Sequence, residues 1–130
     1  MASRKIVSAD TLTVAAQNSD VSQAGGAAKH CIVLYWTPGV TGNILTIKIF
    51  MRPRTNSDDA TFIQEMTWSS AAGTHTRTLD DYQFTATGTT EVGLFITVEQ
   101  AFDEVRISYA EDSTGGAGKG TLTAYHSYAN

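Results

Sequence analysis

The chain has 130 residues, enough for one domain with a buried core that needs no disulfide or metal. Its formal net charge is −4 and its nine Lys and Arg residues are scattered, which argues against nucleic acid as a partner because phosphate binding needs a concentrated basic surface. The single cysteine excludes an internal disulfide. The sequence contains no apolar stretch of signal-peptide or membrane-span length, so we expect synthesis in a cytoplasm and no membrane partner.

Residues 1–10 are predicted to form an N-terminal arm or edge strand, ahead of a single β-sandwich domain over residues 11–130. Arg4 and Lys5 supply positive charge, and Ile6 and Val7 can add a short strand to the edge of a sheet. Residues 11–16 alternate between polar and apolar, which predicts a half-buried strand. Residues 17–29 contain turn formers and small residues and are predicted to be a connection.

Two strongly apolar runs, residues 31–36 and 44–51, are the predicted centre of the fold. Both are short and rich in β-branched and aromatic residues, and Pro38, Gly39 and Gly42 lie between them, so we predict two neighbouring strands joined by a loop. Both faces of the first run are apolar, which predicts packing on two sides, either within a sheet or in a subunit contact. Cys31 lies in this run and is interpreted as an inert core residue.

The second half of the chain is predicted to form further strands. A polar loop over residues 52–59, with Arg52 and Arg54, ends the second apolar run at Pro53. Strands are predicted at 62–69, 74–78, 83–87, 92–98, 104–109 and 120–128, with turns at 71–73 and 88–90. The total of about eight to ten strands with no substantial helix predicts an all-β fold, an antiparallel sandwich of jelly-roll type.

We find no motif that predicts a catalytic or cofactor site. Residues 115–121 are rich in glycine but lead into a strand, which favours a hairpin tip over a phosphate loop. His30, His75 and His126 lie on separate predicted strands without metal-ligand spacing. We therefore expect no enzyme, no cofactor and no metal, although a hydrolase or a zinc site stays an alternative if the histidines converge in space.

Side chains that could supply oxygen ligands for calcium occur at two places in the sequence. They are Asn56, Asp58 and Asp59 in one loop, and Asp80 and Asp81 in another. Neither group follows the spaced pattern of a calcium loop, so both are interpreted as turn formers.

Four aromatic residues exceed what the interior of a small sandwich readily absorbs: Trp36, Trp68, Tyr125 and Tyr128. They either complete the core or lie at a surface that a partner covers, where Trp and Tyr are common. A sugar-binding platform would use the same residue types.

The order of strands and loops resembles that of the small β-sandwich virion proteins of tailed bacteriophages, such as capsid decoration (cement) proteins and related head or tail accessory proteins. The stretches that carry this resemblance are residues 11–16, 33–37, 102–109 and 118–124. The resemblance implies a non-enzymatic virion component, made in the host cytoplasm, that assembles as a homo-oligomer such as a trimer. It also implies contact with the major capsid protein or another virion protein.

The sequence offers three groups of contact residues for such an assembly. They are Arg4, Lys5, Ile6 and Val7 near the N-terminus, Arg52 and Arg54 in the polar loop, and the four aromatics. Many weak contacts repeated over a symmetric lattice give high avidity. The alternative function is a carbohydrate-binding module that stacks sugars on Trp36, Trp68 or Tyr125.

Overall fold

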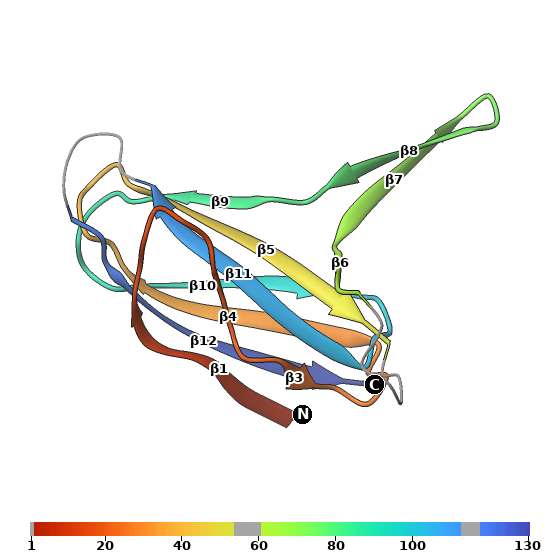
Figure 1. The fold of residues 1–130 in the computed structure, drawn as a ribbon, viewed down its shortest axis with the longest axis horizontal. Helices are drawn as coiled ribbons and strands as arrows, with labels where there is room; N and C mark the ends of the chain where they lie inside the picture. The colour runs from red at the N-terminus through yellow and green to blue at the C-terminus, as the bar shows by residue number, and fades with distance from the viewer. Residues whose placement is uncertain (1, 54–60, 113–117) are drawn as a thin grey trace.

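The computed structural model describes residues 2–53, 61–112 and 118–130 (Figure 1). Within these ranges the chain is all-β. The strands are β1 (Ala2–Thr11), β2 (Gln17–Asn18), β3 (Ser22–Gln23), β4 (Lys29–Thr37), β5 (Ile44–Arg52), β6 (Ile63–Gln64), β7 (Met66–Ala71), β8 (Thr74–Leu79), β9 (Tyr82–Thr85), β10 (Val92–Val98), β11 (Glu104–Asp112) and β12 (Thr121–Ala129). The described ranges contain no helix long and apolar enough to cross a membrane.

Two antiparallel sheets form the body of the molecule. The first has four strands in the order β1-β12-β4-β10. In the second, β11 and β5 lie at the centre, with β2 and β3 beside β11 and with β6 and β9 beside β5. The predicted all-β antiparallel sandwich is confirmed, whereas a jelly-roll strand order stays a prediction.

The core fills the space between the two sheets. Alternate residues of β4, namely Ile32, Leu34 and Trp36, are at most 1% exposed, and β5 buries Ile47 and Ile49 in the same way. Burying each such aliphatic side chain contributes about 1.5–3 kcal/mol relative to leaving it in water. The period-two burial explains why both apolar runs form strands.

The two central strands do not pair with each other, so the prediction that they are neighbours was wrong. β4 lies in the first sheet and β5 in the second. Residues 38–43 therefore cross from one sheet to the other instead of forming a hairpin. Gly39 permits this crossing, because a Cβ atom there would lie 2.4 Å from the carbonyl oxygen of Gly118.

In the N-terminal region the edge strand predicted within residues 1–10 is present as β1, but the strand predicted at residues 11–16 is not formed. β1 pairs with β12 as the edge of the first sheet, and its register shifts between Lys5 and Val7 and again before Asp10. Leu12 still donates a backbone hydrogen bond to Gly120, but Val14 is 63% exposed. Residues 12–16 therefore form a connection between β1 in the first sheet and β2 in the second, despite their alternating pattern.

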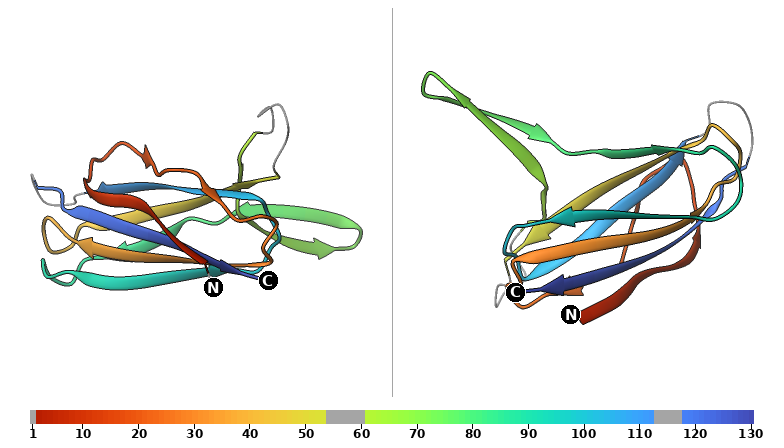
Figure 2. Two further views of the ribbon diagram at one scale, coloured as in Figure 1. Left: turned by 90° about the horizontal axis from the view of Figure 1, so that it is seen from below. Right: turned by 180° about the vertical axis from the view of Figure 1, so that it is seen from behind.

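β7 and β8 form a two-stranded hairpin that projects from the sandwich (Figures 1 and 2). Ala71 pairs with Thr74, so the loop is the two residues Ala72 and Gly73, both with positive φ (51° and 78°). This is the turn that matches the natural twist of a hairpin. The predicted turn at 71–73 and the predicted surface strand after it are confirmed, but the sequence did not predict the projection.

Candidate functional site

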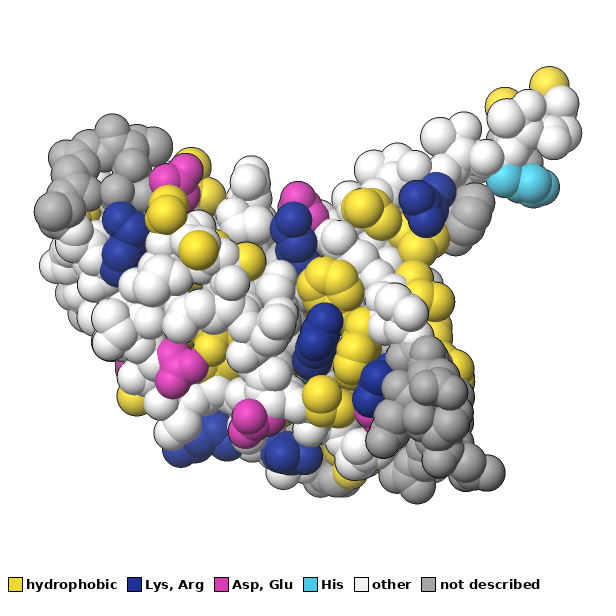
Figure 3. Space-filling view, in the orientation of Figure 1, with side chains coloured by type: hydrophobic (Ala, Val, Ile, Leu, Met, Phe, Trp, Pro, Cys, Tyr) yellow, Lys and Arg dark blue, Asp and Glu magenta, His cyan; other side chains and the backbone are white. Residues whose placement is uncertain are grey.

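The hairpin of residues 66–79, called the arm below, lies outside the core of the molecule. β7 and β8 pair with each other along their whole length, and all six residues of β8 are exposed. None of the arm's described side chains belongs to the hydrophobic core (Figure 3). An isolated two-stranded hairpin is marginally stable at best in water, so the arm needs support at its base or from a partner.

Part of this support comes from Glu65, immediately before the arm, and Tyr82, three residues after it. The Tyr82 hydroxyl donates to the Glu65 carboxylate at 2.9 Å from each oxygen. The backbone N–H of Glu65 donates to the carbonyl of Ile49 in β5, which ties the base of the arm to the second sheet. Burial raises the pKa of Glu65 and also raises the pKa of Tyr82, where the hydrogen bond to Glu65 adds to the effect.

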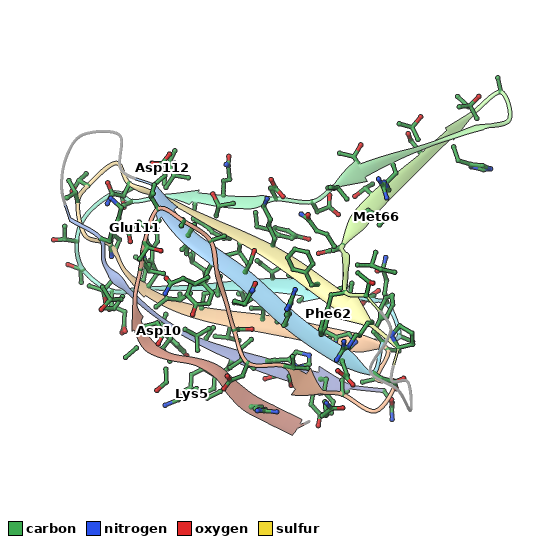
Figure 4. All side chains as sticks on the ribbon, in the orientation of Figure 1. Lys5, Asp10, Phe62, Met66, Glu111 and Asp112 are labelled. Carbon is green, nitrogen blue, oxygen red and sulfur yellow. The ribbon has the colours of Figure 1, made fainter. Side chains whose placement is uncertain are left out.

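Further hydrogen bonds close the base from the other side. Gln64 donates its side-chain amide to the carbonyl of Asp80 at 3.0 Å and to the carboxylate of Asp81 at 2.7 Å. The Thr67 hydroxyl donates to the Asp80 carboxylate at 3.0 Å. Asp80 and Asp81, which the sequence left open as calcium ligands, thus hold the arm in position, and Met66 marks where it leaves the body (Figure 4).

β10 is a long free edge of the first sheet. It pairs with β4 over all seven of its residues, and its other side has no backbone partner in the described ranges. The strand contains neither charge nor proline, and Phe95 is 73% exposed. Exposed glutamates lie immediately before and after it, at Glu91 and Glu99.

The outer face of the first sheet is only partly covered. The register places Lys5, Tyr125, Val33 and Phe95 in one row across β1, β12, β4 and β10. Tyr125 contacts the ring of Tyr35 edge-on, with ring centroids 6.1 Å apart, and Tyr35 is 42% exposed. We predicted that both faces of β4 would be packed. The inner face is fully buried, but the outer face is only partly covered.

Cys31 also faces this outer side. Its side chain is partly exposed, and burial raises the pKa of the thiol. The interpretation of Cys31 as a core residue was wrong, because the inner positions of β4 are taken by its neighbours in the alternation, His30 and Ile32.

The N-terminal contact candidates divide into two pairs. Arg4 and Lys5 are exposed on the edge strand β1, and Lys5 lies 5.7 Å from the ring centroid of Tyr125 (Figure 4). Ile6 and Val7 are only 2% and 3% exposed and belong to the core. Their selection as surface contacts is corrected, since β1 already adds to the sheet of its own chain.

Arg52 is held within its own molecule. Its guanidinium donates to Glu104 at 2.9 Å and stacks on Phe62 at 4.2 Å, and Arg106 stacks on Phe62 as well. Figure 3 shows hydrophobic and basic side chains together on this face. Glu104 is buried together with this ion pair. Arg54 lies outside the described residues, as do Asn56, Asp58 and Asp59.

Trp36 is a core residue and its selection as an interface or sugar-stacking residue is corrected. It is 1% exposed, and its indole N–H donates to Glu111 at 2.7 Å. The Trp68 side chain lies outside the described part. Tyr128 is half-buried, with its ring centroid 5.3 Å from that of His126.

Two of the three histidines lie side by side in the structure, a possibility that the sequence left open. His30 Nδ1 lies 2.9 Å from His126 Nε2, and His126 Nδ1 lies 2.7 Å from the Ser22 hydroxyl. Burial, reinforced by the neighbouring His30, lowers the pKa of His126 to about 4, so the pair is neutral at pH 7. Ser22 is completely buried, so a substrate cannot reach its hydroxyl in this conformation. His75 is on the arm, exposed and apart from them.

Among the described residues, no three His, Cys, Asp or Glu side chains are placed to share a metal ion. A pocket of about 180 Å³ lies beside His30 and Cys31, at the end of β4. A second pocket of about 170 Å³ lies between β10 and β9.

The chain was compared with protein-family models, curated proteins and solved structures. None of the three comparisons found a match.

Sequence reasoning missed the arm as a unit and β10 as an open edge. One signal was present: the Ala72-Gly73 turn is followed by a threonine-rich strand with a single large apolar residue, Leu79. Such a hairpin has nothing to bury against a core. The identity of the free edge carried no comparable signal, because it depends on the order of strands in the sheet.

Proposed function

We propose that this chain is a structural assembly subunit without enzymatic activity, a virion protein of the capsid decoration (cement) type. The observation that carries this proposal is the arm. It extends beyond the body, contributes nothing to the core and is mounted on a network of fixed hydrogen bonds. A chain gains little from holding an exposed hairpin in one direction unless something binds it.

The polar clusters of the interior support a structural role. The residues of the His30–His126–Ser22 cluster are buried and joined by hydrogen bonds, with His30 Nε2 left without a partner in the described part of the chain. The Glu111 carboxylate accepts hydrogen bonds from Trp36, Asn43 and two backbone N–H groups. Buried polar groups that satisfy one another specify a unique packing of the core. We assign both clusters to the stability of the sandwich.

The more specific proposal of a virion protein rests on the resemblance of strand and loop order to phage decoration proteins. A subunit of this size binds weakly through any one small contact, but a lattice presents many copies at once and converts weak contacts into strong attachment. The exposed cations Arg4 and Lys5 and the outer face of the first sheet are then candidates for contact with the capsid.

The test is made on particles. Mass spectrometry of virions from the virus that encodes this chain should detect it in many copies per particle, and purified protein should co-sediment with particles that lack it. Particles devoid of the chain, together with no co-sedimentation, would contradict the proposal.

A second candidate function, glycan binding, is favoured by one observation. Tyr35, Tyr125 and Phe95 lie near one another on the outer face, and flat exposed aromatic rings are suited to stacking on sugars. Binding of the isolated protein on a glycan array, abolished by Tyr35→Ala, would support this candidate over the first.

A further inference from the structure

We propose that the arm of one copy adds through β8 to the free edge of β10 in a second copy. This inference rests on the proposed function, since it names one partner of an assembly subunit as the same chain. The added arm would extend the four-stranded sheet of its neighbour by two strands, through main-chain hydrogen bonds.

β10 is suited to accept a strand because it lacks the devices that normally protect an edge. Natural edges are kept short, charged or bulged. On the opposite side of the same sheet, β1 carries Arg4 and Lys5 and two register shifts. In the second sheet the peripheral strands are two to four residues long. β10 has seven residues, all uncharged, so it is the longest unprotected edge in the described chain.

β8 is suited to supply the strand that is added to β10. It has six residues against the seven of β10, and Thr74, Thr76 and Thr78 alternate along it, a residue type that favours strands. One side of β8 pairs with β7, and the other has no ladder partner in the described ranges. The arm points away from both sheets of its own chain, so β8 meets the β10 of another copy (Figures 1 and 2).

The charges are complementary. Arg77 is the only Lys, Arg, Asp or Glu residue among residues 66–79, and β10 is bracketed by Glu91 and Glu99. With β8 aligned along β10, Arg77 lies opposite the middle of β10 between the two glutamates, so the charges attract the arm to this edge without forming a direct pair. Complementary charges speed the encounter of two surfaces and favour the right partner over others.

An apolar surface lies beside the free edge of β10, where an added strand would cover it. The pocket between β10 and β9 is lined by Trp36, Phe84, Val92 and Leu94 among others, and Val92 is 36% exposed. A strand laid along β10 would close this pocket from water, which adds a hydrophobic contribution to the main-chain bonds.

The contact joins two different surfaces, so a pair of copies joined by it still has one free arm and one free β10 edge between them. Such head-to-tail contacts produce closed rings where the rotation closes and open filaments where it does not. Self-association should therefore continue beyond a dimer in the unmodified chain.

The test is a mixing experiment with two variants. Ladder hydrogen bonds alternate from the Ala71–Thr74 pair that closes the turn, so the backbone N–H of His75 lies on the free side of β8. His75→Pro removes this donor and blocks the arm, whereas Phe95→Lys places a charge on the β10 edge and blocks the acceptor. Both residues are exposed, so circular dichroism should show a folded chain in each case. We expect each variant alone to be a monomer, and a mixture of the two to form a dimer of one copy of each, measured by native mass spectrometry.

A charge-reversal series gives an independent check. Arg77→Glu should weaken self-association about tenfold, and adding Glu91→Lys and Glu99→Lys to it should restore most of the loss. The matched control is Arg4→Glu on the edge strand β1, which should leave self-association unchanged.

Three results would overturn the inference: no self-association of the unmodified chain, variants that assemble like the unmodified chain, or a mixture that stays monomeric. These outcomes are separable from failure of the proposed function. If monomeric His75→Pro bound particles and the unmodified chain did not self-associate, the virion role would stand and this inference would fall.

Discussion

The indole N–H of Trp36 in β4 donates a hydrogen bond of 2.7 Å to the carboxylate of Glu111 in β11, and both residues are almost fully buried. Because the two strands belong to different sheets, this contact joins the halves of the sandwich at one end of β11, where Figure 4 labels Glu111. Burial acts to raise the pKa of Glu111, but hydrogen bonds from Asn43, Trp36 and two backbone N–H groups outweigh it, so the pKa is lowered.

Glu111→Gln should lower the free energy of unfolding by about 2–4 kcal/mol, because the amide presents N–H groups to donors that need an acceptor. Chemical denaturation of the two proteins measures the loss. The control is Asp112→Asn at the neighbouring exposed position, which should stay within about 0.5 kcal/mol of the unmodified chain. Equal stability of Glu111→Gln and the unmodified chain would show that the carboxylate has no such role.

His126 should make stability depend on pH in the acidic range. Its pKa in the folded chain is about 4, below the ordinary value of 6.5. The unfolded chain therefore binds a proton first, and the contribution of neutral His126, complete above pH 6.5, is lost as the pH falls toward 4.

In His126→Gln the fall in the free energy of unfolding between pH 6.5 and 4 should be clearly smaller, as measured by denaturation at several pH values. His75→Gln, on the exposed arm, is the control and should reproduce the slope of the unmodified chain. An unchanged slope for His126→Gln would contradict the assignment.

Tyr82→Phe should loosen the arm while leaving the body intact. It removes the hydrogen bond to Glu65 and should lower the free energy of unfolding by about 1 kcal/mol. Hydrogen exchange followed by mass spectrometry should show faster exchange in residues 66–79 and no change in β5 and β11. Tyr35→Phe, on the half-exposed outer face, is the control; arm exchange that matches the unmodified chain in both variants would be evidence against a hydrogen-bonded base.

Gly120→Ala should destabilise the fold by about 3 kcal/mol or more, since a Cβ atom would lie 1.7 Å from the carbonyl oxygen of Thr37. Gly88→Ala meets no atom within 4 Å and should stay within about 0.5 kcal/mol. Thermal unfolding of both variants gives the two melting temperatures to be compared. Similar melting temperatures for the two would show that the close approach at Gly120 is not required.

The all-β class followed from the sequence because burial in a strand has a period of two, and β5 and β11 carry that pattern in their apolar residues, while β4 is a short run of β-branched and aromatic residues. The pairing of strands did not follow, because the pattern says which side of a strand is buried and not which strand lies beside it. That is why β4 and β5 were expected to be neighbours although they lie in opposite sheets.

The contact residues were harder to predict than the fold. Trp36, Ile6 and Val7 look the same in the sequence whether they face a core or a partner, and the structure assigns all three to the core. The convergence of His30 and His126 needs β4 and β12 to be paired, which no local pattern shows. The sequence predicted only parts of the arm, namely its turn and a following strand poor in apolar residues.

Sedimentation velocity of the unmodified chain over a wide range of concentration tests the central claim, that this chain works by assembly, most directly. We expect the average mass to rise above the 13.9 kDa of one chain as the concentration increases, and to stay at that value in His75→Pro. A single species of 13.9 kDa at every concentration of the unmodified chain would contradict the claim.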